Sequence, residues 1–198
     1  MCCRFYIDKE TPEMKEILRQ MHRSPLMERF PATDATGEIR PTDIAPVIAP
    51  DRKGQPAIFP MQWGYHARSL LINARVETVA EKPTFREDWL RHRCIIPATS
   101  YFEWEHQAGP DGRTSTGAKY AIHPANGTPT WLCGLYHIEA GLPYFVVLTR
   151  EPADSIRFIH DRMPMLLPED RLAAWISPKT KPEALLPYAV TDVEYEIF

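Results

Sequence analysis

The sequence TWLCGLYHI at residues 130–138 is followed, after four residues, by PYFVVLT at residues 143–149. Both runs are rich in β-branched and aromatic residues, which predicts two strands. Shorter runs of the same kind predict three more strands at Cys94–Ile96, Tyr101–Trp104 and Lys119–His123. The polar stretch His106–Gly117 predicts a mobile loop between two of them. This half of the chain is therefore expected to form an antiparallel meander.

The remaining residues predict short elements on either side of this meander. The 20 prolines recur along the whole sequence and exclude long helices. In chain order we expect an opening strand at Cys3–Ile7, a helix capped by Thr11 with Pro12 at its first position, irregular structure over Pro25–Pro56 with a short strand near Ala45–Ile48, a strand at Ala57–Tyr65, a helix that begins with a capping box at Thr84, short helices at Pro152–Phe158 and Pro168–Trp175, and an edge strand at Val193–Phe198.

Length and composition indicate a soluble globular protein that forms one domain over residues 1–198. Hydrophobic residues make up 44% of the chain and charged residues 25%, which is typical of globular proteins. Neither a secretory signal nor an apolar run long enough to span a bilayer is expected, so we predict a cytoplasmic protein without membrane contact. The net charge of −3 means that any nucleic-acid binding must depend on a local basic patch.

The four cysteines show no paired spacing of the kind that typifies metal sites. They are Cys2, Cys3, Cys94 and Cys133. Without a secretory signal a disulfide framework is not expected, and zinc would require a scattered ligand set that includes residues such as His123 or His137. We therefore expect no metal and no cofactor, and we expect Cys94 and Cys133 to be packing residues.

The first residues carry an unusual chemical possibility. Removal of Met1 would leave Cys2 with a free α-amine and a free thiol on adjacent carbons. Such an amine is partly unprotonated near neutral pH and forms an imine with an aldehyde, after which the thiolate can close a thiazolidine ring. The alternative is that Cys2 and Cys3 are small residues at the start of a buried strand.

Polar side chains stand at the ends of several predicted strands. Asn73 and Arg75 are two residues apart, so in an extended segment both face one side, where they could hold a substrate oxygen and a phosphate. Glu103 lies among three aromatic residues, which tends to raise a carboxyl pKa toward the range useful for proton transfer. His160, followed by Asp161 and Arg162, is suited to proton transfer near neutral pH. Each motif could instead be structural.

Two further positions are candidates for contact with nucleic acid. Trp63 could stack on a base, although a core tryptophan would fit the pattern equally well. Thr149 and Arg150 add a hydroxyl group and a cation at another strand end. Neither position is decisive by itself.

Taken in order, these motifs resemble those of the SOS response-associated peptidase (SRAP) family, and the resemblance spans the chain. The motifs are Met1-Cys2-x-Arg4, Trp63-Gly64, Asn73-Ala74-Arg75-x-Glu77-Thr78, Arg93-Cys94-Ile95-Ile96-Pro97, Tyr101-x-Glu103-Trp104, Leu148-Thr149 and His160-Asp161-Arg162-Met163-Pro164. The resemblance implies a single compact α+β domain, predominantly antiparallel β with barrel-like sheets and several short helices. The oligomeric state stays open, with a monomer as the default, and we expect the protein to associate with the nucleoid when it binds DNA.

In activity, the resemblance implies a protein that processes abasic sites in single-stranded DNA. After autoproteolytic or enzymatic removal of Met1, it would form a covalent thiazolidine crosslink to the ring-opened sugar. By motif, the catalytic residues would be Cys2 as nucleophile and amine, Asn73 as the group that holds the cysteine or the sugar, Glu103 as proton shuttle and His160 as its assistant. The residues that grip phosphates and stack the neighbouring base would be Arg4, Trp63, Arg75, Thr149 and Arg162.

Two other functions remain open from the residues. A cysteine-dependent peptidase acting in trans could use Cys2, His160 and Asn73. A non-catalytic module that binds single-stranded DNA could use Trp63 and the arginines. The chain also departs from the usual family pattern at three places: Cys3 replaces a usual Gly, Pro41–Pro46 differs from an Asn-containing stretch, and the span from Gly64 to Asn73 is short.

Overall fold

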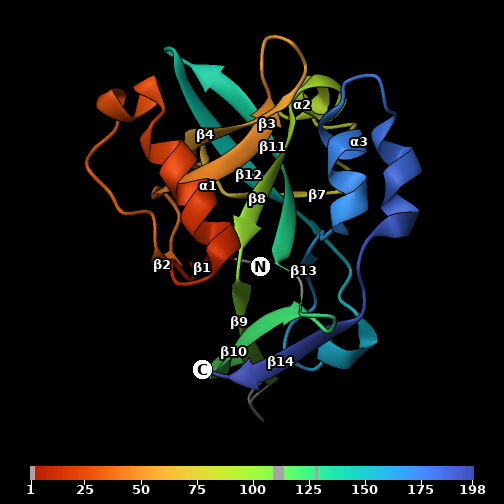
Figure 1. Cartoon of the computed structure of the whole chain (residues 1–198). Coiled ribbons are helices and arrows are strands. Elements are labelled where there is room, and N and C mark those ends of the chain that lie inside the picture. Colours follow the sequence, from red (N-terminus) through yellow and green to blue (C-terminus); the bar gives the residue numbers. More distant parts are fainter. Residues whose placement is uncertain (1–2, 109–113, 128) are drawn as a thin grey trace.

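The structure is a computed structural model, and it describes residues 3–108, 114–127 and 129–198. Its fold is α+β and consists mostly of strands (Figure 1). The strands are β1 (Arg4–Ile7), β2 (Gly37–Ile39), β3 (Ile44–Pro50), β4 (Pro56–Trp63), β5 (Tyr65–His66), β6 (Leu70–Leu71), β7 (Asn73–Arg75), β8 (Arg93–Ala98), β9 (Ser100–Ala108), β10 (Thr114–Pro124), β11 (Thr130–Glu139), β12 (Leu142–Arg150), β13 (Met163–Pro164) and β14 (Val193–Ile197).

The helices are short. They are α1 (Pro12–His22), α2 (Arg86–Arg91), α3 (Leu172–Ile176) and the 3₁₀ segments η1 (Pro25–Arg29), η2 (Asp154–Ile156), η3 (Glu169–Arg171) and η4 (Pro182–Tyr188). In Figure 1, α1 lies on one side of the central strands β8 and β9, and α3 lies on the other. Among the described residues no helix is long and apolar enough to cross a membrane.

Five strands close into a barrel. In the larger sheet the order is β11-β8-β3-β4-β12, and β11 also pairs with β12, which completes the ring. β13 and β7 both attach to β12 outside this ring. A second sheet, with the order β14-β10-β9-β1-β2, lies at the lower end of the barrel in Figure 1. Closing the ring removes exposed strand edges from the barrel.

Most of the predicted strands are confirmed, and the edge position of β14 is as expected. The loop predicted for His106–Gly117 is wrong for its described residues, because β9 runs to Ala108 and β10 begins at Thr114. These strands pair as a hairpin whose register shifts between Thr116 and Lys119. Residues 109–113 of the predicted loop lie outside the described residues. The described part of this stretch, residues 106–108 and 114–117, therefore lies in paired strands despite its polar composition.

The meander is also less uniform than predicted. β12 pairs in parallel with β4, where Phe145 lies opposite Trp63, and in parallel with β7, where Val147 lies opposite Asn73. Parallel pairing requires a long connection between the strands, so adjacent segments of sequence give no signal for it. The strands described in this half pair with one another antiparallel, as predicted, but they are divided between two sheets, so they do not form a single meander.

Both predicted helix caps differ from the structure. α1 does follow Thr11, but the Thr11 hydroxyl donates to the carbonyl of Asp8 at 3.1 Å instead of capping the helix. α2 begins after Phe85 rather than at a capping box on Thr84. At α1, the hydrogen bond from the Thr11 hydroxyl to Asp8 prevails over the cap pattern.

Arg93 anchors the helices on one side of the barrel. Its side chain is buried on β8, and the guanidinium donates to the backbone carbonyls of Trp89, Leu90, Trp175, Ser177 and Thr180. Burial lowers the pKa of Arg93. Because these carbonyls come from the ends of α2 and α3, one side chain satisfies the unpaired acceptors of both helices.

Candidate functional site

Glu103 is a nearly buried carboxyl group on β9, with 3% of its surface exposed. Burial raises the pKa of Glu103 to about 7, and the negative charge of Asp161 acts in the same direction. A carboxyl group with this pKa exchanges its proton near neutral pH.

His160 lies in the turn between η2 and β13 and is also buried. Burial lowers the pKa of His160 to about 4, and the nearby His106 adds to this effect, so the imidazole is neutral at pH 7. The two imidazole rings lie 4.3 Å apart between centroids. A neutral imidazole carries one proton, so its tautomer decides what it can donate.

The hydrogen bonds of His160 indicate which nitrogen carries that proton. The backbone N–H of Arg162 donates to Nδ1 at 3.0 Å, while Oδ1 of Asp161 lies 2.8 Å from the same nitrogen. A backbone N–H can only donate, whereas the Asp161 side chain is exposed and can turn away. We therefore assign Nδ1 as the acceptor, which leaves the proton on Nε2.

The proton-bearing Nε2 of His160 faces Glu103. It lies 4.0 Å from Oε2 of Glu103. This distance exceeds that of a hydrogen bond, so a small polar group of a substrate could approach both side chains. The two residues, 57 positions apart in sequence, thus form a buried centre with one neutral donor and one exchangeable proton.

The start of the chain lies beside this centre. β1 pairs antiparallel with β9, with Arg4 opposite Phe102, so the next position in register places Cys3 opposite Glu103. Burial raises the pKa of the Cys3 thiol, and the charge of Glu103 raises it further. Cys2, the predicted nucleophile, lies outside the described residues. The structure therefore describes the chain from Cys3, the residue that follows the predicted nucleophile.

Asn73 and Arg75 are both on β7, as the extended segment predicted. Ala74, which lies between them, is buried, while Asn73 is partly buried and Arg75 is exposed. Asn73 lies opposite Val147 and Arg75 lies opposite Thr149 on β12. The sequence therefore correctly indicated one face for the amide and the guanidinium.

The partly buried Arg162 links two segments of the chain. Its guanidinium donates to both carboxylate oxygens of Glu77, at 2.9 and 2.8 Å, and to the backbone carbonyl of Thr149 at 2.8 Å. Burial acts to raise the pKa of Glu77, but the hydrogen bond and charge of Arg162 outweigh it and lower this pKa. These contacts tie the turn that carries His160 to the end of β12.

Two predicted DNA contacts are buried in this structure. Trp63 has no exposed surface, packs between Phe5 and Phe145, and donates its indole N–H to the carbonyl of Ile72 at 2.9 Å. The side chain of Thr149 is also fully buried. Of the two possibilities left open for Trp63, the structure therefore supports the core position.

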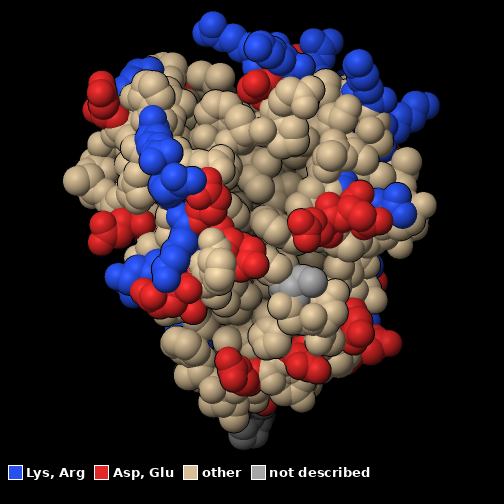
Figure 2. Space-filling view, in the orientation of Figure 1, with Lys and Arg blue, Asp and Glu red and all other residues tan. Residues whose placement is uncertain are grey.

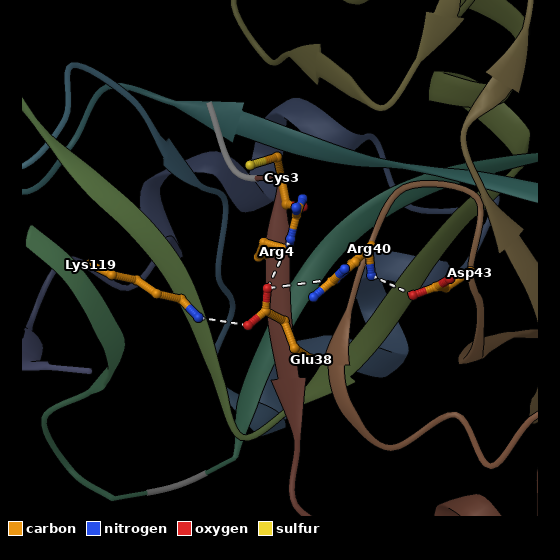
Figure 3. A network of polar contacts seen from close by, with 6 residues as sticks. All are labelled: Cys3, Arg4, Glu38, Arg40, Asp43 and Lys119. Carbon is orange, nitrogen blue, oxygen red and sulfur yellow. Dashed lines mark hydrogen bonds and ion pairs between the residues drawn. The ribbon is translucent and has the colours of Figure 1, made fainter. Parts of the chain in front are cut away.

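Arg4 is paired within the protein. Its Nε donates to Glu38 at 2.9 Å, and its Nη1 donates to the carbonyl of Cys3 at 3.0 Å. Lys119 donates to the other carboxylate oxygen of Glu38 at 2.6 Å (Figure 3). Sequence reasoning did not identify Glu38 or Lys119 as site residues, because their contact joins β2 and β10, which are far apart along the chain.

Charges are unevenly distributed over the surface. In Figure 2, Lys and Arg gather along the upper edge and in a column on the left, while Asp and Glu predominate in the lower half. Among the described residues, no group of three or more His, Cys, Asp or Glu is placed to hold a metal ion. Cys94 and Cys133 are fully buried, and burial raises the pKa of both thiols, as expected for packing residues.

The fold is shared with solved structures of low sequence identity. One protein from Bacteroides thetaiotaomicron superposes with a TM-score of 0.76 at 20% identity, covering all of this chain and 92% of that chain. A phage-related protein from Bordetella bronchiseptica superposes with a TM-score of 0.73 at 20% identity, covering all of this chain and 94% of the other.

Similar sequences include two proteins with names that state a role. Abasic site processing protein YoaM of Bacillus subtilis is 37% identical over 134 residues, which is 63% of this chain and 57% of that protein. Abasic site processing protein YedK of Escherichia coli is 30% identical over 125 residues, or 59% of this chain and 54% of that protein. The matched stretch thus spans little more than half of each relative.

A family model covers nearly the whole sequence. The model of the SOS response associated peptidase (SRAP) family matches residues 1–196. This match includes the start of the chain, the Glu103–His160 pair and β7. The chain belongs to the SRAP family.

Proposed function

We propose that this chain processes abasic sites in single-stranded DNA by a covalent reaction. After removal of Met1, the amine and thiol of Cys2 would capture the aldehyde of a ring-opened abasic sugar. The observation that carries this proposal is the buried pair of Glu103 and His160, which lies beside Cys3. The names of the relatives YoaM and YedK support the same substrate.

The reaction proceeds in two balanced steps after processing. Hydrolysis of the bond between Met1 and Cys2 consumes one water and releases methionine. The Cys2 amine then adds to the aldehyde, and loss of one water gives an imine. The thiol finally adds across the C=N bond, with its sulfur on carbon and its proton on nitrogen, to give a thiazolidine. The sum of the last two steps is protein plus aldehyde yielding crosslink plus one water.

Glu103 is suited to move the protons of these steps. Dehydration of the amine–aldehyde adduct needs a base for the nitrogen and an acid for the departing hydroxyl. With a pKa of about 7, the carboxyl group serves as base in one form and as acid in the other. One group can therefore accept the amine proton and return it to the hydroxyl that leaves as water.

His160 has a different role from Glu103. Its low pKa keeps it neutral, and its Nδ1 accepts the N–H of Arg162, so Nε2–H is a hydrogen-bond donor. A neutral donor orients the aldehyde or hydroxyl oxygen without placing a second cation near the reacting amine. We propose that His160 holds this oxygen while Glu103 transfers the proton.

Asn73 and Arg75 provide the DNA-facing part of the proposal. The Asn73 amide is proposed to hold the opened sugar or the cysteine, and the exposed Arg75 is proposed to contact a phosphate. Arg162 and Thr149 would act indirectly, since Arg162 links Glu77 to the Thr149 carbonyl. A covalent bond also allows a chain of net charge −3 to hold DNA without a large basic surface.

Intact mass spectrometry tests the proposal in one experiment. The purified protein is weighed before and after incubation with a single-stranded oligonucleotide that carries one abasic site. The expected results are loss of the Met1 mass and a gain equal to the oligonucleotide minus one water. Cys2→Ala is expected to abolish the gain, and Cys3→Ala is the matched control that retains it.

Other outcomes would contradict the proposal. Equal and salt-reversible binding to intact and abasic DNA, without a covalent adduct, would indicate a binding module. Turnover of unrelated peptides by protein that already lacks Met1 would indicate a peptidase that acts in trans. Dependence of the adduct on Cys3 instead of Cys2 would show that the proposed nucleophile is wrong.

A further inference from the structure

Glu38 lies at the centre of a polar network next to the start of the chain. Figure 3 shows its carboxylate on β2 with Arg4 on one side and Lys119 on the other. Oε1 accepts from Arg4 Nε at 2.9 Å, and Oε2 accepts from Lys119 Nζ at 2.6 Å. Burial acts to raise the pKa of Glu38, but hydrogen bonds and charge from Lys119 and Arg4 lower it, so the group is ionised. Oε1 therefore holds Arg4 and also lies 3.8 Å from Nε of the more exposed Arg40, while Oε2 holds Lys119.

Lys119 is itself fixed in position. Its ammonium nitrogen lies 3.8 Å from the ring centroid of Phe102, 4.5 Å from that of Phe198 and 5.5 Å from that of Trp104. Aromatic faces attract a cation within about 6 Å, and the attraction is stronger where water is excluded. The Lys119 side chain is only 18% exposed. Glu38 is therefore held by a partner that has little freedom to move.

Arg4 connects Glu38 to the backbone of Cys3. While its Nε is bound to Glu38, its Nη1 donates to the Cys3 carbonyl at 3.0 Å. The carbonyl belongs to the peptide plane that links residues 3 and 4, and a planar peptide turns as one body. Holding it fixes the Cα atom of Cys3, from which the chain continues toward Cys2.

We propose that Glu38 is a positioning residue for the reactive N-terminus, and that Arg4 is the link through which it acts. This inference rests on the function proposed above. The chain from Lys119 through Glu38 and Arg4 to the Cys3 carbonyl orients the Cys2 amine and thiol for reaction at the Glu103–His160 centre. In this assignment, the role of Arg4 is to hold the Cys3 carbonyl and not to bind a DNA phosphate.

The chemistry of the guanidinium provides the discriminating variant. Arg presents donors in a rigid fork and can hold a carboxylate and a carbonyl together, whereas Lys is a point charge on a flexible stem. Arg4→Lys therefore keeps a cation that can bind phosphate but loses the bridge between Glu38 and Cys3. Glu38→Gln leaves Arg4 intact and weakens its attachment.

The experiment compares two quantities for each variant. The single-turnover rate of adduct formation is measured with saturating abasic DNA, and Kd is measured with an oligonucleotide that carries an unreactive tetrahydrofuran in place of the abasic sugar. For Glu38→Gln and for Arg4→Lys we expect the rate to fall about 10- to 100-fold, the loss typical of a misplaced reacting group. We expect Kd and its salt dependence to stay close to those of the unchanged protein.

Glu16→Gln is the matched control. Glu16 also accepts hydrogen bonds from an arginine, Arg19, but lies on the exposed surface of α1. The Glu16→Gln substitution removes the same charge as Glu38→Gln and should leave the rate of adduct formation unchanged. Thermal melting of each variant shows whether it is folded; if Glu38→Gln does not fold, Arg4→Lys decides the matter.

Three results would overturn the inference. An unchanged rate in Glu38→Gln would show that the network does not position the N-terminus. A weaker Kd in Glu38→Gln, or full activity in Arg4→Lys, would assign Arg4 to phosphate binding. Failure of the proposed function itself is distinct, because then the unchanged protein would form no adduct in the same assay.

Discussion

The Nε2 atom of His160 lies 4.0 Å from Oε2 of Glu103, and the two side chains are 6% and 4% exposed. Burial changes their pKa values in opposite directions, to about 4 for His160 and to about 7 for Glu103. Around pH 7 the imidazole of His160 is therefore neutral, and the carboxyl group of Glu103 is about half protonated. A site of this kind favours proton transfer over the binding of a permanent charge.

Glu103→Gln is expected to slow adduct formation by about 10²- to 10⁴-fold, the usual contribution of a general acid–base group. The amide has nearly the same shape as the carboxyl group but cannot exchange a proton. The rate is measured on denaturing gels or by intact mass at saturating abasic DNA. A rate within a factor of two of the unchanged protein would remove Glu103 from the mechanism.

The rate of adduct formation should depend on pH as a bell-shaped curve. In the reactive form, the Glu103 carboxyl and the Cys2 amine together carry one proton. Below about pH 7 Glu103 is protonated as well, so the pair carries two protons. Above about pH 8 the amine has lost its proton, so the pair carries none. Rates measured from pH 5 to 10 should peak between these values. Glu103→Gln should lose the basic limb and reach a plateau above about pH 8, because only deprotonation of the Cys2 amine then limits the rate. A basic limb that persists in this variant would have to come from another group.

The stability of the protein should also respond to Glu103. Its pKa is raised from 4.5 to about 7 on folding, so between these values the folded state keeps a proton that the unfolded state has lost. The free energy of unfolding therefore falls as pH rises through this window, by on the order of 3 kcal/mol. Urea denaturation measures the free energy of unfolding of both proteins at pH 4.5 and at pH 8. From the lower to the higher pH, Glu103→Gln should become more stable relative to the unchanged protein by about this amount. An equal difference at both pH values would contradict the raised pKa.

Arg75→Ala should weaken the binding of single-stranded DNA that carries no abasic site. Arg75 is exposed on β7, and removal of one phosphate contact should reduce the slope of log Kd against log salt by about 0.7. Fluorescence anisotropy at several salt concentrations measures this slope.

Arg162→Ala is the informative contrast to Arg75→Ala. Its guanidinium is bound to Glu77 and to the Thr149 carbonyl, so its loss should lower stability by about 1–3 kcal/mol with little change in the salt slope. If Arg162→Ala changed the slope and Arg75→Ala did not, the two roles would be reversed.

Trp63→Ala should destabilise the fold by about 3–5 kcal/mol, because the indole is fully buried between Phe5 and Phe145. Trp63→Phe retains the ring and loses the hydrogen bond to Ile72, so a smaller loss is expected. Anisotropy with intact single-stranded DNA should give the same Kd for Trp63→Phe as for the unchanged protein. A large increase in Kd would show that Trp63 contacts a base.

The strands could be predicted from sequence because their signals are local. The runs at residues 130–138 and 143–149 have the composition of buried strands, and they are the cores of β11 and β12. The partners of β12 could not be predicted, since its contacts with Trp63 and Asn73 join residues that are more than 70 positions apart. The closed barrel depends on such pairings, so composition indicates its strands and not their order.

The site shows the same division. The aromatic neighbours of Glu103 in sequence correctly suggested a raised pKa, although burial within the whole fold produces it. Trp63 was ambiguous because a tryptophan beside glycine occurs both in cores and on stacking surfaces. Glu38 gave no signal, because nothing in its local sequence reveals that Arg4 and Lys119 lie on either side of it.

The position of β12 has a consequence for how the protein acquires its activity. Asn73 is placed by the pairing of β7 with β12, and the His160 turn is tied by Arg162 to the Thr149 carbonyl on the same strand. Large loops must close before these contacts form, which is slow and entropically costly. We expect partly folded chains to have a nucleophilic N-terminus but no assembled proton-transfer centre, so that maturation of the reactive pocket coincides with the final stage of folding.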